Sequence, residues 1–115
     1  MDKNNKKITI LLVNYNTSKF VEILLYSLQK LTLNSYKVII CDNGSNDNEI
    51  LKLLKVVTKY KNIDMIFRLQ SKSGSIAHGE ALDILIKKVK TKYAVIMDTD
   101  CVLLMKYWDK YMINQ

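Results

Sequence analysis

Two acidic residues separated by one position, Asp98 and Asp100, directly follow the apolar stretch Tyr93–Met97. A short apolar run of this kind is typical of a strand that is buried on both faces of a parallel sheet. If the chain stays extended beyond the strand, both carboxylates point to the same side. At about 6 Å apart and an effective dielectric constant of about 20, they would repel each other by about 3 kcal/mol. A hard divalent cation such as Mg²⁺ would offset this repulsion, whereas the alternative interpretation is a solvated acidic turn.

The elements that must position this acidic pair alternate along the chain. Apolar and β-branched runs predict strands at Ile8–Val13, Tyr36–Cys41, Ile63–Leu69 and Tyr93–Met97. Apolar residues at helical spacing predict a helix capped by Thr17 or Ser18, a helix capped by Ser45 or Asp47, a helix over Ile76–Val89 and a short final piece around Trp108. This alternation predicts an α/β fold, specifically a Rossmann-like three-layer α/β/α sandwich with a mainly parallel sheet.

Each predicted strand ends in polar residues. In open sheets of this kind, ligands bind beyond the carboxyl ends of the strands, where the strand order reverses. A sheet with a purely structural role would not need carboxylates after two separate strands, so we expect the binding site at this edge. The polar strand ends are Asn14–Asn16, Asp42–Asn46, Arg68–Gly74 and Asp98–Asp100.

The chain of 115 residues fits one domain over residues 1–115, and its formal net charge is +7. All but one of its 18 basic residues are Lys, and many stand at predicted helix ends, where they complement the helix dipole. This distribution argues against nucleic-acid binding and leaves a diffuse attraction to phosphates or lipid head groups as the minor alternative.

The two cysteines, Cys41 and Cys101, have neither the spacing of a metal site nor that of a disulfide framework. No apolar run has the length of a membrane span, and the lysine-rich start lacks the apolar stretch of a signal peptide. We therefore expect a cytoplasmic protein with free thiols that could work near a membrane.

Several common nucleotide-binding and catalytic motifs are absent. The sequence has no G-x-x-x-x-G-K-[ST], and no G-x-G-x-x-G follows the first strand, which disfavours P-loop and dinucleotide-binding proteins. The first strand ends in Asn-Tyr-Asn rather than an acidic pair, which disfavours a receiver domain, and no Ser lies in G-x-S-x-G. The lone His78 has no partner at ligand spacing, so we interpret it as a polar residue near the ligand rather than a catalytic one.

Two segments, Ile8–Asn16 (ITILLVNYN) and Val38–Asp47 (VIICDNGSND), combine a strand with a polar turn. His78–Asp83 (HGEALD) lies near a helix start, and Ala94–Asp100 (AVIMDTD) leads into the acidic pair. In this order, the segments resemble the first strand, the V-D-[DN]-G-S-x-D segment, the G-x-x-x-A-x-N segment and the D-x-D motif of family 2 glycosyltransferases with the GT-A fold. The resemblance covers nearly the whole chain and implies the N-terminal, donor-binding half of such an enzyme.

The resemblance implies a role for each matching residue. Asp100 would hold Mg²⁺ or Mn²⁺ on the diphosphate of a nucleoside diphosphate sugar, and Asp98 would bind the ribose or reach the metal through water. Asp42 would accept a hydrogen bond from the base, and Arg68 or Lys72 would face the base or the phosphates. The implied nucleotide-sugar-binding residues are Asn14, Tyr15, Asn16, Asp42, Asn43, Gly44, Arg68, Lys72, His78, Gly79 and Asp98, and the implied metal ligands are Asp98 and Asp100.

The chain also departs from the family pattern. The Pro that often begins the turn after the first strand is absent, and Asp83 replaces a common Asn. In the family, the acceptor site and the carboxylate that deprotonates the acceptor hydroxyl come after the D-x-D motif. Only one acid, Asp109, follows Asp100 here, and we assign it no catalytic role. The acceptor, in a polysaccharide, a lipid or a protein glycan, is not defined by the sequence.

Three alternatives to a glycosyltransferase follow from these departures. The first is a nucleotide-sugar-binding module without a catalytic base. The second is a nucleotidyltransferase-like enzyme, which would require a loop rich in glycine and in arginine or lysine after the first strand, and Asn14–Lys19 lacks such a loop. The third is an assembly protein, such as a homodimer formed through an exposed sheet edge, with an apolar surface around Tyr107, Trp108 and Tyr111.

Overall fold

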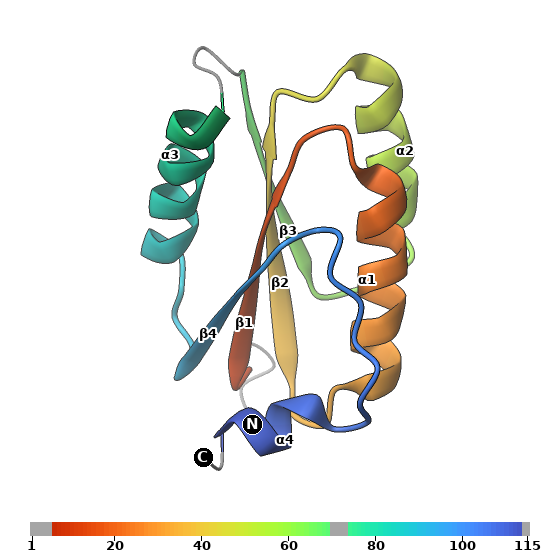
Figure 1. The fold of residues 1–115 in the computed structure, drawn as a ribbon, viewed down its shortest axis with the longest axis vertical. Coiled ribbons are helices and arrows are strands. Elements are labelled where there is room, and N and C mark those ends of the chain that lie inside the picture. The colour runs from red at the N-terminus through yellow and green to blue at the C-terminus, as the bar shows by residue number, and fades with distance from the viewer. Residues whose placement is uncertain (1–5, 70–73, 114–115) are drawn as a thin grey trace.

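The computed structural model describes residues 6–69 and 74–113 of the chain. In these ranges, strands and helices alternate in the order that the apolar periodicity predicts (Figure 1). The elements are β1 (Ile8–Asn14), α1 (Ser18–Leu31), β2 (Tyr36–Asn43), α2 (Asp47–Val57), β3 (Ile63–Arg68), α3 (Gly74–Lys87), β4 (Tyr93–Met97) and α4 (Trp108–Ile113).

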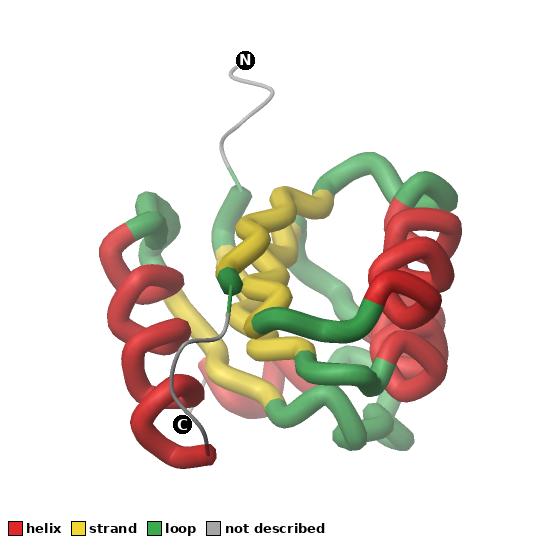
Figure 2. The backbone as a smooth tube through the Cα atoms, turned by 90° about the horizontal axis from the view of Figure 1, so that it is seen from above, coloured by secondary structure: helices red, strands yellow, loops and turns green. Residues whose placement is uncertain are grey.

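The described strands form one parallel sheet in the order β3-β2-β1-β4. β1 lies in the interior, where Leu12 aligns with Ile40 of β2 on one side and with Met97 of β4 on the other. Seen from above, α3 covers one face of the sheet, whereas α1 and α2 lie against the opposite face (Figure 2). The predicted three-layer α/β/α sandwich is therefore confirmed.

The alternation of side chains along the strands builds a core on each face of the sheet. On one face, residues such as Ile10 and Val38 pack with the buried side of α1 and α2, including Leu24 and Leu53. On the other face, a smaller core joins the sheet to α3 and consists of Leu11, Ile39, Cys41, Ala81 and Leu85. Both faces of β1 and β2 are thus buried, which explains why these strands are almost continuously apolar.

Strand β2 continues two residues beyond the predicted end at Cys41. Asp42 pairs in register with Asn14 of β1, and Asn43 pairs with Arg68 of β3. Both residues therefore belong to the sheet, so the predicted turn at these two positions is wrong. The turn begins at Gly44, whose positive φ of 86° is a conformation that glycine adopts without strain.

The helix caps differ in part from expectation. Asn46, rather than Ser45 or Asp47, caps α2, because its side chain accepts a hydrogen bond from the Glu49 amide at 3.0 Å. Thr17 does occupy the N-cap position of α1, but its side chain makes no capping hydrogen bond. Its hydroxyl group is used instead at the site described below.

The C-terminal element α4 lies at the end of the sheet away from the polar strand ends (Figure 1). Trp108 is buried and donates its indole N–H to the Thr32 hydroxyl at 2.9 Å, so it is not part of an exposed aromatic surface. The buried Asp109 carboxylate accepts hydrogen bonds from the amides of Leu33 (2.9 Å) and Asn34 (2.8 Å). Asp109 therefore has a structural role here. None of the described helices is long and apolar enough to cross a bilayer.

Candidate functional site

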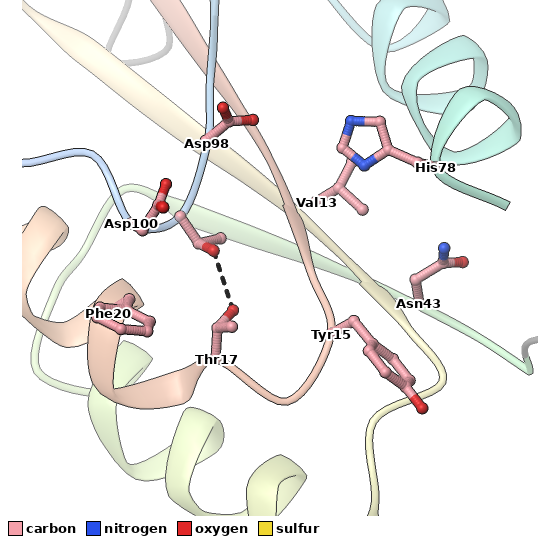
Figure 3. Close-up of a pocket in the computed structure, with 9 residues that line it drawn as sticks. Val13, Tyr15, Thr17, Phe20, Asn43, His78, Asp98 and Asp100 are labelled. Carbon is pink, nitrogen blue, oxygen red and sulfur yellow. Dashed lines mark hydrogen bonds between the residues drawn. The ribbon is translucent and has the colours of Figure 1, made fainter. Parts of the chain in front are cut away.

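The carboxyl ends of β1 and β4 meet at a pocket of about 530 Å³ (Figure 3). The chain progresses from β1 through β2 to β3 on one side and then returns to β4 on the other side of β1. The pocket therefore lies where the strand order reverses, which is the usual ligand position in an open parallel sheet. Its described lining residues are Val13, Tyr15, Thr17, Phe20, Asn43, His78, Asp98, Thr99 and Asp100.

The acidic pair lines this pocket, but its backbone is not extended as the sequence argument assumed. The Cys101 amide donates to the Asp98 carbonyl oxygen at 3.0 Å, which closes a turn directly after β4. Asp98 and Asp100 are exposed, whereas the intervening Thr99 is buried. The turn thus presents both carboxylates to the pocket and anchors itself through the residue between them (Figure 3).

Two threonines connect the loop after β1 to this acidic turn. The hydroxyl oxygens of Thr17 and Thr99 lie 3.0 Å apart, within hydrogen-bonding distance. Thr17 donates its own hydroxyl hydrogen to the side-chain oxygen of Asn14 at 2.6 Å. Neither threonine is among the site residues predicted from the sequence, although the position of Thr99 between the two acids is a signal for it.

Asp42 is only 1% exposed, and both of its carboxylate oxygens accept hydrogen bonds from the protein. Oδ1 accepts from the Asn14 side-chain amide at 2.9 Å and from the Ser45 hydroxyl at 2.7 Å. Oδ2 accepts from the Ser45 backbone amide at 3.0 Å. The carboxylate consequently holds the loops after β1 and β2 together.

The asparagines on either side of Tyr15 brace the same loops rather than line the pocket. Asn14 is fully buried in the network around Asp42. Asn16 has a positive φ of 55°, and its side-chain oxygen accepts from the Asn46 amide at 2.9 Å. Together they present Tyr15, which is 52% exposed, at the mouth of the pocket.

A second pocket of about 500 Å³ adjoins the first and shares Tyr15 with it. Among its lining residues are Asp42, Gly44 and Arg68, all of which the sequence analysis assigned to nucleotide binding. Tyr15 thus stands between two cavities that open at neighbouring strand ends. Their common border suits a ligand with two chemically different parts.

Arg68, at the end of β3, connects the strand ends to α3. Its guanidinium donates to Glu80 Oε2 at 2.8 Å, to the side-chain oxygen of Asn43 at 3.2 Å and to the Ala77 carbonyl oxygen at 3.3 Å. These bonds fix the start of α3, from which His78 lines the first pocket. Burial raises the pKa of the neighbouring Cys41 thiol, an effect that the Arg68 charge partly opposes.

Besides Asn14 and Asn16, one more of the expected site residues, Gly79, is not among the residues that line the two cavities. Gly79 lies on an exposed part of α3, and a Cβ atom added there would meet nothing within 4 Å. A side chain larger than hydrogen would therefore fit at Gly79 without a clash with the described part of the protein, and the role of Gly79 in nucleotide-sugar binding stays a prediction. Lys72 lies outside the described residues. Phe20 shares the helical spacing of the core-facing Leu24 and Leu28, which is typical of a buried residue, yet it is 47% exposed and lines the first pocket.

The chemistry of the first pocket suits a divalent cation that arrives with a ligand. Its described lining includes two carboxylates but neither Lys nor Arg. No group of three His, Cys, Asp or Glu side chains that could hold a metal occurs among the described residues. Mg²⁺ and Mn²⁺ accept oxygen ligands, and Mg²⁺ is commonly held by one or two carboxylates plus substrate phosphates. Asp98 and Asp100 fit that arrangement.

Comparison of this chain with known proteins gives a family match and a relative of known name. Residues 9–115 match the family described as Glycosyl transferase family 2. A teichoic acid poly(glycerol phosphate) polymerase of Staphylococcus epidermidis is 30% identical over 95 residues, which cover 82% of this chain and 13% of that protein.

Solved structures share the fold at low sequence identity. S. aureus TarS 1-349 in complex with UDP has a TM-score of 0.75 at 19% identity, over 93% of this chain and 31% of that one. The mannosyltransferase PcManGT of Pyrobaculum calidifontis, in complex with GDP-Man and Mn²⁺, has a TM-score of 0.66 at 17% identity, over 87% of this chain and 29% of that one. The chain thus spans less than a third of the length of these relatives. Because the family match extends over residues 9–115, the chain belongs to glycosyl transferase family 2 and carries a GT-A type sheet.

Proposed function

We propose that this chain binds the donor of a metal-dependent glycosyltransferase, a nucleoside diphosphate sugar. The observation that carries this proposal is the meeting of Asp98 and Asp100 with Tyr15, Asn43 and His78 in one pocket at the strand-order reversal. TarS in complex with UDP-GlcNAc and PcManGT in complex with GDP-Man support a ligand of this class.

The charges of the pocket explain why a cation would be required. A diphosphate is an anion, and two carboxylates without a Lys or Arg among the described lining residues would repel it. A bound Mg²⁺ or Mn²⁺ supplies the positive charge that stabilises the departing diphosphate. Asp100 and Asp98 are the residues that would hold it. The Mn²⁺ in the complex of PcManGT supports this part of the proposal.

The two adjoining pockets suit the two ends of such a donor. The base would lie against Tyr15 in the second pocket, near Asp42 and Arg68, and the diphosphate would extend toward Asp100 in the first pocket. Aromatic side chains stack on bases of any identity, so Tyr15 would supply affinity without selecting the base. Selection would then depend on the polar groups around Asp42 and Arg68.

The transfer would break the bond between the anomeric carbon of the sugar and the diphosphate oxygen. A hydroxyl oxygen of the acceptor would form the new bond to that carbon, its proton would pass to a base, and the nucleoside diphosphate would leave. The curated relative is named for the synthesis of a phosphate-rich polymer, so such a polymer is the first acceptor class to test. The free cysteines support a cytoplasmic location for the reaction.

A second candidate function is donor binding without transfer. The acids that line the first pocket are Asp98 and Asp100, both of which we assign to the metal, and the buried Asp109 is engaged at the other end of the sheet. No carboxylate among the described lining residues therefore remains to act as the base. Nucleotide binding together with the absence of transfer would favour this second candidate.

Calorimetric titration with UDP, GDP, CDP and ADP, each with and without Mn²⁺, tests the proposal. We expect one nucleotide to bind only when Mn²⁺ is present, and Mn²⁺ alone to bind far more weakly because the phosphates complete its ligand set. Asp100→Ala should weaken binding by about thirtyfold, since loss of a charged ligand costs about 2 kcal/mol.

The matched control is Asp64→Ala, which removes an exposed carboxylate near the amino end of β3. Asp64 forms an ion pair with Lys37 at 2.8 Å and no other ion pair within residues 6–69 and 74–113, so its loss should leave nucleotide binding unchanged. Equal affinities of Asp100→Ala and the original chain would refute the assignment of the metal ligand. The absence of any nucleotide binding would refute the proposed function itself.

A further inference from the structure

A lysine-lined groove of about 420 Å³ runs between α1 and α2 on the outer helical layer. Its charged side chains are Lys19, Glu22, Glu49, Lys52, Lys55 and Lys59. The four lysines exceed the two glutamates, so the groove carries a net positive charge. These lysines belong neither to the core nor to the first pocket, which is called the nucleotide pocket from here on.

The ion pairs inside the groove leave positive charge available. Glu22 lies 3.3 Å from the Lys19 ammonium and 3.6 Å from that of Lys59, and Glu49 lies 3.5 Å from Lys52. Lys55 has no ion-pair partner in the part of the chain that the structure describes. The paired lysines Lys19, Lys52 and Lys59 are exposed, and ion pairs of exposed lysines contribute little stability, so these ammonium groups can turn toward an incoming anion at small cost.

The spacing of the lysines suits a ligand with repeated charges. Lys52 and Lys55 lie on the same side of α2, about 4.5 Å apart along the helix axis, and Lys59 follows in the turn after the helix. A linear polymer with one phosphate in each short repeat can therefore meet successive ammonium groups along α2.

The groove begins beside the nucleotide pocket. Ser18 and Lys19 line the groove, whereas Thr17 and Phe20 line the pocket, and all four belong to the first turn of α1 or to its N-cap. A chain lying in the groove would thus reach the pocket around the end of α1. This proximity connects the groove to the transfer reaction rather than to a separate function.

The other polyanionic partners fit the groove less well. Its described lining contains no aromatic side chain, so bases of a single-stranded nucleic acid would find no stacking surface. A membrane surface is flat and anionic, whereas Glu22 and Glu49 lie within the groove beside the lysines. A narrow strand with spaced phosphates can bind the ammonium groups and avoid the carboxylates.

We propose that the groove between α1 and α2 binds a linear phosphodiester polymer and leads one end of it to the nucleotide pocket. The role of this polymer as acceptor rests on the proposed function, whereas the binding itself does not. The ligand class is defined by phosphates at regular intervals on a flexible chain without bases.

The test measures binding of a fluorescent oligo(glycerol phosphate) of about ten repeats to the full chain at several salt concentrations. The groove variant Lys52→Gln/Lys55→Gln/Lys59→Gln should bind at least about tenfold more weakly, with a shallower dependence on salt, because fewer phosphates are neutralised. The matched control Lys87→Gln/Lys88→Gln/Lys90→Gln removes the same charge at the end of α3 and should stay within about twofold of the original affinity.

Each contrary result would overturn the proposal. Equal losses in the two variants would mean that net charge alone attracts the polymer. If oligouridylate binds as tightly as the polymer, and its affinity falls as much in the groove variant, the groove is a nucleic-acid site and the proposal is wrong. If anionic vesicles bind as tightly and their affinity falls as much, the groove is a membrane site and the proposal is also wrong. Titration of the groove variant with nucleotide and Mn²⁺ separates the two proposals. Loss of polymer binding in a variant that still binds nucleotide supports the groove. Failure of the original chain to bind any nucleotide contradicts the proposed function and leaves the test of polymer binding unaffected.

Discussion

Replacing Asp42 with Ala would remove the acceptor at the centre of the loops that carry the two adjoining pockets. In the folded chain this carboxylate is buried and accepts from the side-chain amide of Asn14 and from both the hydroxyl and the backbone amide of Ser45. Asp42→Ala would leave these three donors without their acceptor. The Ser45 backbone N–H is the most costly of them, because a backbone group cannot turn toward another partner.

The magnitude follows from the number and type of these bonds. A hydrogen bond to a charged group contributes about 1.5–3 kcal/mol, and an unsatisfied buried donor costs a comparable amount. The Asn14 amide retains a weak contact of 3.5 Å with the Ser45 hydroxyl, and that hydroxyl can rotate, so the losses are not fully additive. We therefore expect Asp42→Ala to lower the free energy of unfolding by about 3–4 kcal/mol.

Urea unfolding followed by the fluorescence of Trp108, the single tryptophan, measures this loss. With a urea dependence of about 1–3 kcal/mol per M, the midpoint should fall by about 2 M. Asp42→Asn, which keeps one acceptor oxygen, should lose about half as much, and Asp64→Ala should lose less than about 1 kcal/mol. A midpoint of Asp42→Ala within about 0.3 M of the original chain would refute the structural role of the carboxylate.

Three further predictions follow from the described contacts. Thr17→Val, which cannot hydrogen-bond to Thr99, should weaken nucleotide binding about three- to tenfold, whereas Thr17→Ser should bind normally; equal binding by both would contradict this role. Burial raises the pKa of the Asp109 carboxyl, but hydrogen bonds from Leu33 and Asn34 outweigh burial and hold the pKa below its usual 3.8. The stability that Asp109 contributes should therefore be complete above about pH 4 and be lost as the pH falls through the folded-state pKa of its carboxyl. The unfolding curves of Asp109→Asn and of the original chain should accordingly differ at pH 7 and converge in acid. Maleimide labelling read by mass spectrometry should modify the exposed Cys101 rapidly and the buried Cys41, whose thiol pKa burial raises, only on unfolding.

The sequence alone predicts much of this architecture because strand identity depends on local apolar patterns. The runs Ile8–Val13 and Tyr93–Met97 are nearly devoid of polar residues, and both are strands. The acidic pair follows the second of these runs, so the position of the main pocket could be predicted from the parallel sheet. The family could be predicted because the matching segments lie at these same strand ends.

Other features depend on pairing partners that no local pattern reveals. Asp42 and Asn43 read as turn residues, yet parallel pairing with β1 and β3 draws them into the sheet, so Asp42 is buried rather than exposed in the turn. Phe20 reads as a core residue because its spacing is helical, yet its position in the first turn of α1 directs it to the pocket. The contact of Thr17 with Thr99 spans 82 positions and depends on β1 and β4 being neighbours.

Strand β4 is hydrogen-bonded to a neighbour on one side only in the described sheet, and Ile96 on it is 53% exposed. The acidic turn therefore extends from an edge strand, and its position is maintained by one ladder of hydrogen bonds and by the Thr17–Thr99 contact. Such a segment opens locally at a lower free energy than the interior strands. Donor binding would then slow amide hydrogen exchange along β4. The free energy needed to order β4 and the acidic turn would lower the observed affinity for the donor.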